Sequence, residues 1–280
     1  MEFPAFQIFM MLLLAGGMFY GQRVYKKKRA EWGKTFTIGC AFGIILLTIY
    51  TNLIRKPNTE GPRLINMAYE RAQAIVLANQ LANMYSGQGK CLVIHGPQYN
   101  EADKESVNHL VSAFKDGFQN RVTEIRAVPI RNVVPGPNGF SEEDMGEFTA
   151  EEFNKVIKDN KDCDMIVLLI KLPFSETELF EMDPFLMIED PNNPNKWIRD
   201  PKKDYPLVGV FNGYIGNSES LFHDNLLGAM TMWRPNPVID DKEAPEDVKE
   251  AFQKRYVVVT NQNIDEMKTK YPTLFPTEKK

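Results

Sequence analysis

The side chains that could bind a small molecule or do chemistry follow runs that the sequence predicts to be buried strands. The candidates, in chain order, are His95, Gln98, Tyr99, Asn100, Lys171, Ser175, Asn212, Tyr214 and Asn217. In an open parallel sheet, ligands bind outside the carboxyl ends of the strands. Hydrogen-bonding and stacking groups of this kind suit a small polar ligand. His95 could also act as an acid or base, although a histidine in such a place is more often structural.

No nucleophile–base pair and no cofactor motif accompanies these residues. The chain lacks the GxGxxG, GxxxxGK[ST] and GxSxG patterns. His109 and His223 lie on different predicted helices, and the acids at 181–190 lack the spacing of a calcium loop. Cys91 and Cys163 start two predicted strands, where they could form a disulfide or remain two small buried thiols. We therefore predict that the protein is not an enzyme and has no metal and no cofactor.

The composition is that of a globular protein with a distinct N-terminal segment. The 280 residues are 43% hydrophobic and 25% charged, and three cysteines are too few for a disulfide-stapled mini-protein. The net charge of −4 argues against a general nucleic-acid binder. Residues 1–56 hold eight basic and two acidic side chains, so +6, which leaves −10 for the remainder. A basic, very apolar segment therefore precedes an acidic body.

Residues 1–56 are predicted to form a transmembrane helical hairpin. The runs 3–22 and 35–54 contain no charged side chain, and a helix of about 20 apolar residues spans a bilayer. The loop between them, 23–34, has six basic residues and one acid, which should keep it cytoplasmic. We expect the hairpin to lie in the inner (cytoplasmic) membrane. The N-terminus and everything after the hairpin would then be periplasmic.

Two other interpretations of this segment are weaker. A signal peptide carries positive charge before its apolar run, whereas only Glu2 precedes this one. Two buried core helices would not require a basic loop between them. Small residues at Gly16, Gly17, Gly39 and Gly43 allow helices to approach closely. They could pack the hairpin on itself or dock another membrane subunit.

After a polar linker at 57–62, the body from 63 to 280 alternates helix and strand patterns. Helices are predicted at 63–85, 103–119, 149–160, 218–230, 245–255 and 263–272. Strands are predicted at 90–95, 122–130, 164–173, 205–214 and 256–260. Thr149 and Glu152 form a capping box, and residues 132–148 form a loop. This order predicts an α/β fold with one doubly wound, flavodoxin-like parallel sheet.

One long segment, 174–205, interrupts the alternation. It is rich in Pro, Asn and Asp, and a crossover helix could lie in SETELFEM. Its larger apolar side chains include Phe185, Met187 and Trp197. They could pin the loop to its own domain, or they could form a partner-binding surface, since Met and aromatic residues are common at interfaces.

Three stretches of the body share a pattern with a known protein family. They are AQAIVLANQLANMYSGQGKCLVIHGPQYNEADKESVNHLVSAFKDGF, DCDMIVLLI and LVGVFNGYIGNSESLFHDNLLGAMTMWRPNP. Together they resemble the second lobe of the type I periplasmic substrate-binding proteins, in the sugar-binding group. The resemblance covers most of 70–265 and implies a periplasmic-binding-lobe fold with a ligand at the strand ends.

The chain departs from that family at two ligand-contacting positions. Leu110 stands where the family usually has an Arg, and Asn212 where it has an Asp. The part of the chain before Gln73 is mostly hairpin, so the first lobe is expected to be missing. A single lobe cannot close on a ligand. The resemblance therefore implies shared fold more firmly than shared binding.

These observations give two main hypotheses of function, and a third, an enzyme that uses His95, for which no catalytic partner is evident. The first is a non-catalytic, membrane-anchored periplasmic domain that serves as an accessory or scaffolding subunit of a larger membrane complex. Its partners would be the lipid bilayer and other membrane-protein subunits. The alternative is a membrane-tethered protein that binds or senses a small, sugar-like molecule. Nucleic acid is not an expected partner in either.

Overall fold

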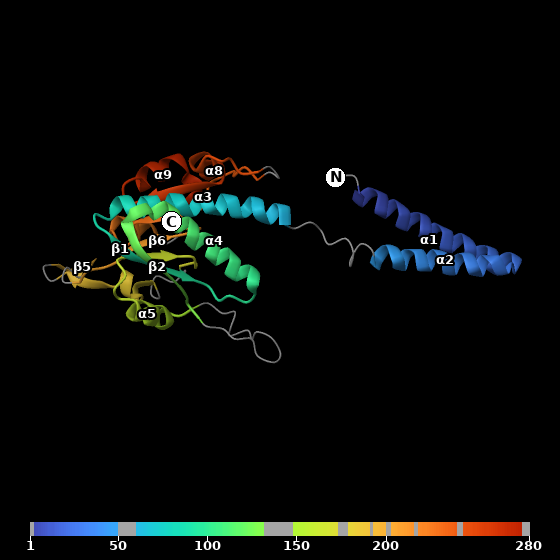
Figure 1. Cartoon of the computed structure of the whole chain (residues 1–280), viewed down its shortest axis with the longest axis horizontal. Helices are drawn as coiled ribbons and strands as arrows, with labels where there is room; N and C mark the ends of the chain where they lie inside the picture. Colours follow the sequence, from blue (N-terminus) through green and yellow to red (C-terminus); the bar gives the residue numbers. More distant parts are fainter. Residues whose placement is uncertain are drawn as a thin grey trace. The chain divides into compact units, whose positions relative to one another are not determined.

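A computed structural model of the chain describes residues 3–49, 60–131, 148–172, 179–190, 193–199, 203–215, 218–239 and 243–275. The chain divides into two compact units, Met1–Gly61 and Pro62–Lys280. The first unit is a helical hairpin, and the second is an α/β domain (Figure 1). Each unit is described separately below.

The hairpin consists of α1 (Phe3–Lys28) and α2 (Glu31–Ile49). The chain reverses at Arg29, which adopts a left-handed backbone with φ of 46°. Glycines bring the helices together near this turn. A Cβ atom on Gly21 would lie 2.9 Å from the carbonyl oxygen of Gly33, and one on Gly33 would lie 2.7 Å from that of Gly21. Only glycine allows so close an approach of two helix backbones.

The four glycines expected to pack the hairpin fall into two pairs. A Cβ on Gly17 would contact Cys40 of α2, and one on Gly43 would contact Leu14 of α1. Cβ atoms on Gly16 and Gly39 would meet nothing within 4 Å, so these two residues face away from the contact. Of the two roles that the sequence leaves open, packing of the hairpin on itself holds for Gly17 and Gly43 and is wrong for Gly16 and Gly39.

Much of the described outer surface of the hairpin is apolar. Leu12 is 67% exposed and Phe19 is 76% exposed, and Ile38, Phe42 and Ile45 also point outward. Among the residues that the structure describes, no helix is both long enough and apolar enough to cross a membrane. The transmembrane hairpin therefore stays a prediction.

The second unit is built on a six-stranded sheet. Its strands, in spatial order, are β2 (Val122–Pro129), β1 (Gly89–His95), β3 (Met165–Leu168), β6 (Leu207–Val210), β7 (Ala229–Trp233) and β8 (Tyr256–Thr260). The first five run parallel, as expected for an α/β fold. β8 is antiparallel to β7. The prediction of an entirely parallel sheet is therefore wrong at this edge.

β7 is a second correction. The sequence pattern predicts a helix over 218–230, but α7 covers only Glu219–His223 and a strand begins at Ala229. The strand sequence is AMTMW, and Ala and Met are good helix formers. Burial between two neighbouring strands therefore decided the conformation here, against local propensity.

Helices cover both faces of the sheet. α3 (Glu60–Met84), α4 (Glu101–Phe118) and α8 (Val248–Arg255) pack on one face. α5 (Ala150–Asp159), α7 and α9 (Ile264–Lys270) pack on the other, with η5 (Pro272–Leu274) after α9. A short turn, η2 (Gln119–Arg121), links α4 to β2. Alternation along β1 sends Cys91 toward the first face and Leu92 toward the second, which makes the strand buried on both sides.

The segment 174–205 is not simply a loop. It contains a 3₁₀ turn, η3 (Asp183–Phe185), and an antiparallel pair, β4 (Met187–Asp190) and β5 (Asn193–Arg199). Residues 173–178, which include the first half of the proposed crossover helix, lie outside the described residues.

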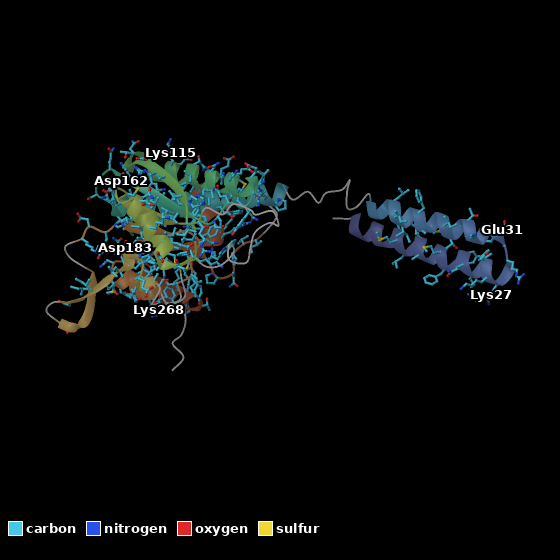
Figure 2. All side chains as sticks on the ribbon, turned by 90° about the horizontal axis from the view of Figure 1, so that it is seen from below. Lys27, Glu31, Lys115, Asp162, Asp183 and Lys268 are labelled. Carbon is cyan, nitrogen blue, oxygen red and sulfur yellow. The ribbon has the colours of Figure 1, made fainter. Side chains whose placement is uncertain are left out.

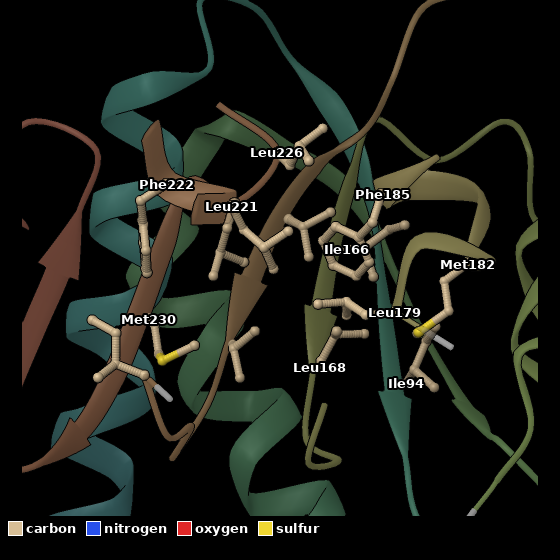
Figure 3. Close-up of a cluster of buried hydrophobic side chains, with 14 of the residues drawn as sticks. Ile94, Ile166, Leu168, Leu179, Met182, Phe185, Leu221, Phe222, Leu226 and Met230 are labelled. Atoms are coloured by element: carbon tan, nitrogen blue, oxygen red, sulfur yellow. The ribbon is translucent and has the colours of Figure 1, made fainter. Parts of the chain in front are cut away.

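The three residues expected to bind a partner differ in their surroundings. Phe185 is completely buried in the main core, together with Leu179 and Met182 (Figure 3). Its expected place on an exposed surface is therefore corrected, because η3 turns the ring inward. Met187 is half-buried and packs against the same core. Trp197 lies in β5, and its side chain is outside the described residues.

Candidate functional site

The carboxyl ends of β1, β3 and β6 meet at one edge of the sheet. The backbone ladder continues just beyond the strands, since Leu169 donates to the carbonyl of Ile94 (2.8 Å) and Phe211 to that of Leu168 (2.9 Å). β1 and β6 are separated by one strand, so their ends are about 10 Å apart. The candidates that follow β1 and β6 thus share one edge, as their sequence positions predict.

His95 is the last residue of β1 and is buried. Its Nδ1 lies 2.7 Å from the carbonyl oxygen of Gly96. A carbonyl only accepts, so Nδ1 carries the proton and Nε2 is the acceptor of the ring. Burial lowers the pKa of His95, which favours the neutral form. This histidine can accept one hydrogen bond from a ligand hydroxyl, and nothing in its contacts marks it as a catalytic base.

Asn100 is occupied mainly by helix capping. Its Oδ1 accepts from the N–H of Asp103 (3.0 Å), and the Asp103 carboxylate accepts from the N–H groups of Asn100 and Tyr99. This capping box starts α4. The N-x-x-D spacing could have revealed it in the sequence. Only the side-chain NH₂ of Asn100 is left for a ligand, so its expected role is reduced.

The turn after β6 exposes an aromatic ring. Asn212 has a left-handed backbone with φ of 54°, and its N–H donates to Thr231 Oγ1 (3.3 Å). Thr231 is itself held by the buried Gln73, whose Nε2 donates to the same oxygen (2.9 Å). The chain then leaves the sheet with Tyr214 62% exposed. On the β1 side, Tyr99 is 36% exposed and Gln98 is half-buried.

Sequence reasoning missed two residues at this edge. Arg131 follows β2 and binds Glu152 of α5 through two hydrogen bonds, of 2.5 Å from Nε and 2.7 Å from Nη2. Arg131 holds the pKa of Glu152 below its usual value. Trp233 ends β7 and packs on Tyr256, with ring centroids 4.9 Å apart. The strand predicted at 122–130 ends next to Arg131 and could have indicated it, whereas no predicted strand ends at Trp233.

The remaining candidates contribute little to a shared site. Lys171 is exposed after β3, whereas Ser175 and Asn217 lie outside the described residues. His109 lies on α4, where its Nε2 donates to the carbonyl of Met67 (2.9 Å), and His223 lies on α7. In the part of the chain that the structure describes, no three His, Cys, Asp or Glu side chains could hold a metal ion.

The cysteines are free thiols buried in the structure. Cys91 and Cys163 belong to the clusters on opposite faces of the sheet. Burial raises the pKa of both thiols, so neither is activated as a nucleophile.

Comparison with known proteins yields structural similarity only. No protein-family model matches the chain, and no curated protein matches it. Among solved structures, a solute-binding protein of an ABC transporter from Burkholderia graminis C4D1M, in complex with D-arabinose, is 13% identical with a TM-score of 0.39. The similarity covers 70% of this chain and 60% of that one.

Two proteins from Geobacillus stearothermophilus give similar values. An arabinose-binding protein is 13% identical (TM-score 0.39), with 70% of this chain and 62% of that one covered. A glucose-galactose-binding protein is 11% identical (TM-score 0.37), with 70% and 61% covered. The chain thus spans about 60% of the length of these proteins. All three are solute-binding proteins, the class that the sequence resembles, but at these scores their ligands are no evidence about this chain.

Proposed function

We propose that this protein binds a small polyhydroxylated molecule at the carboxyl edge of its α/β unit, while the N-terminal hairpin anchors it in a membrane. The observation that carries the proposal is that two exposed tyrosines, Tyr99 and Tyr214, lie four residues after β1 and β6, parallel strands whose ends are about 10 Å apart. Aromatic rings provide stacking surfaces for sugar-like rings. Gln98, the NH₂ of Asn100 and His95 Nε2 supply hydrogen-bonding groups on the β1 side of this site.

The fixed loops around the tyrosines support this site. The capping box fixes the path of the chain through Tyr99 to Asn100, and Thr231 fixes the turn that precedes Tyr214. A site whose loops are already ordered loses less conformational entropy on binding. The neutral state favoured for His95 suits hydrogen bonding to hydroxyl groups and gives no reason to expect catalysis.

Thermal unfolding of the full chain in detergent tests this proposal. A panel of pentoses, hexoses and nucleosides is added at millimolar concentration. A ligand at a hundred times its Kd stabilises a protein by about 2.7 kcal/mol, which corresponds to about 5–11 °C in Tm for a domain of this size. Tyr99→Ala and Tyr214→Ala should each weaken binding about 2- to 10-fold.

The matched control is Tyr20→Ala, which removes an equally exposed tyrosine from the hairpin. It should leave ligand binding unchanged. If no compound in the panel raises Tm, or if both site variants bind as well as the unaltered chain, the binding proposal fails.

Anchoring of the hairpin is supported by its outward-facing apolar side chains, which would be costly to expose to water. Basic side chains gather at the end where α1 meets α2, and Figure 2 shows Lys27 there. Under the positive-inside rule this end would be cytoplasmic in an inner membrane, and both the N-terminus and the α/β unit would be periplasmic. Alkaline carbonate extraction of membranes tests the anchor. Full-length protein should stay in the pellet, and its release would contradict insertion.

A second candidate function is an accessory or scaffolding subunit of a membrane complex. The observation that favours it is the outward position of Gly16 and Gly39, which offer a flat surface to another helix. Affinity capture of the full chain in a mild detergent should then recover a stoichiometric membrane partner. Gly39→Leu should abolish recovery and leave the hairpin intact, because its side chain points into open space. Recovery of the tagged protein alone would count against this function.

A further inference from the structure

A groove runs along the outer edge of β8, which is the edge strand of the sheet at the opposite end from β2. Its volume is 780 Å³, within the range of ligand-binding sites. α3 and α8 contribute one wall, through residues that include Ile75 and Phe252. α9 and the residue after it contribute the other, through Met267 and Tyr271. Figure 1 shows these three helices around the edge strand.

Tyr256, Val257 and Val258 of β8 line the groove. In an antiparallel pair, alternate residues direct their N–H and C=O groups toward the partner strand. Arg234 donates to the carbonyl of Arg255 (2.9 Å), which fixes the alternation. Tyr256, Val258 and Thr260 therefore direct their backbone groups away from β7, toward the groove.

Asn263 covers one end of this edge. Its Oδ1 accepts from the N–H of Thr260 (2.7 Å), and its Nδ2 donates to the carbonyl of Val258 (3.1 Å). At the other end, the N–H of Tyr256 donates to the carbonyl of Phe252. Two outward groups remain between these caps, the C=O of Tyr256 and the N–H of Val258. Among the hydrogen bonds of the described residues, none engages either group.

These two groups are what one residue of an added strand requires. In a strand that runs parallel to β8, a residue opposite Val257 would donate its N–H to the carbonyl of Tyr256 and accept from the N–H of Val258. The caps on both sides leave a single register for such pairing. Strand addition at an exposed sheet edge is a general way in which proteins bind extended peptides.

The charges that line the groove indicate the peptide's character. Arg234, Lys249 and Lys270 line it, against one acid, Asp247. The carboxylate of Asp247 already accepts from the N–H of Glu250 (2.7 Å) as the N-cap of α8. The apolar walls suit aliphatic side chains, and the basic rim suits carboxylates.

We propose that this groove binds an extended segment of a partner protein, with alternating apolar and acidic residues, by strand addition to β8. The site is separate from the carboxyl-edge ligand site and does not depend on it. Side chains on one face of the added strand would enter between Phe252 and Tyr271. Carboxylates on the segment would reach Lys249 and Lys270.

The test uses the full chain in detergent micelles and a phage-displayed library of random dodecapeptides. The proposal expects enrichment of peptides that alternate apolar residues with Asp or Glu. A fluorescein-labelled copy of the most enriched peptide is then titrated by anisotropy. The double variant Lys249→Glu, Lys270→Glu should weaken binding about tenfold or more, through lost attraction and new repulsion.

The matched control is Lys115→Glu, Lys158→Glu, which makes the same change of charge on α4 and α5. It should leave the affinity unchanged. Hydrogen exchange tests the backbone contact, because bound peptide should slow exchange of the Val258 amide. Three results would each overturn the proposal: no enrichment over detergent alone, equal weakening in both double variants, or a bound peptide that leaves exchange at 256–258 unchanged.

Discussion

Replacement of Phe185 by alanine distinguishes the two roles that the sequence allows for its ring, packing in the core of its own domain and binding a partner protein. The ring is completely buried, and Figure 3 shows it beside Ile166 of β3. It is held there by η3, in which the N–H of Phe185 donates to the carbonyl of Met182 (2.9 Å). A second contact fixes this turn, since Asn154 Oδ1 accepts from the N–H of Asp183 (2.7 Å). The ring is therefore part of the core that packs the segment 174–205 against the sheet.

The expected cost follows from this burial. Phe→Ala at a buried site costs about 3–5 kcal/mol, as lost transfer free energy plus the cavity left behind. In a domain of this size each kcal/mol shifts Tm by about 2–4 °C, so Phe185→Ala should lower Tm by about 6–20 °C. Phe185→Leu retains most of the apolar volume and should lower it much less.

The measurement is thermal unfolding of the full chain in detergent, followed by near-ultraviolet circular dichroism. Tyr214→Ala is the control, because an exposed side chain changes stability by about 0.5 kcal/mol or less. A Tm for Phe185→Ala within about 2 °C of the unaltered chain would refute the assignment to the core. Loss of a membrane partner at unchanged Tm would instead restore the interpretation of Phe185 as an interface residue.

Three further substitutions test other parts of the α/β unit. Gly117→Ala would place a Cβ 2.6 Å from a carbonyl oxygen of α3, so the urea midpoint should fall by the equivalent of about 1–3 kcal/mol; an unchanged midpoint would contradict the close α3–α4 contact. Asn263→Ala removes the cap on the Thr260 amide, which should exchange faster while stability falls by about 1–3 kcal/mol; unchanged exchange would show that Asn263 does not protect this edge. Arg131 lowers the pKa of Glu152 below 4.5, so the stability that the pair contributes is present above pH 4.5 and is lost as the pH falls through the lowered pKa. The difference in stability between the unaltered chain and Glu152→Gln should therefore shrink on acidification, and a constant difference would contradict the ion pair.

The predictions that succeeded rest on local patterns. The apolar run 90–95 is buried on both sides, so it has the continuous hydrophobicity of a central parallel strand. Thr149 and Glu152 form the expected capping box at 3.2 Å and 2.8 Å, because four consecutive residues contain all its donors and acceptors. α3 and α4 lie within a few residues of their predicted bounds.

The predictions that failed depend on contacts distant in sequence. AMTMW becomes β7 because its neighbours in the sheet bury it, although its Ala and two Met residues favour helix. The direction of β8 cannot be read from YVVVT, since both orientations of an edge strand bury alternate valines equally well. Phe185 has the same local sequence whether its ring lies in a core or on an interface. Only the tertiary fold decides these cases.

The same distinction applies to the candidate site. Position at a strand end predicted which residues share an edge, because parallel strands place their carboxyl ends together. It could not say which side chains are already engaged. Asn100 caps α4, and the turn at Asn212 is held by Thr231, which lies 19 residues further along the chain. The polar groups at this edge therefore fix its loops, and the exposed rings of Tyr99 and Tyr214 offer surfaces that a ligand can contact. A site of this kind would bind through ring stacking first, with hydrogen bonds adding selectivity, so the tyrosine variants test it more directly than changes to the amides.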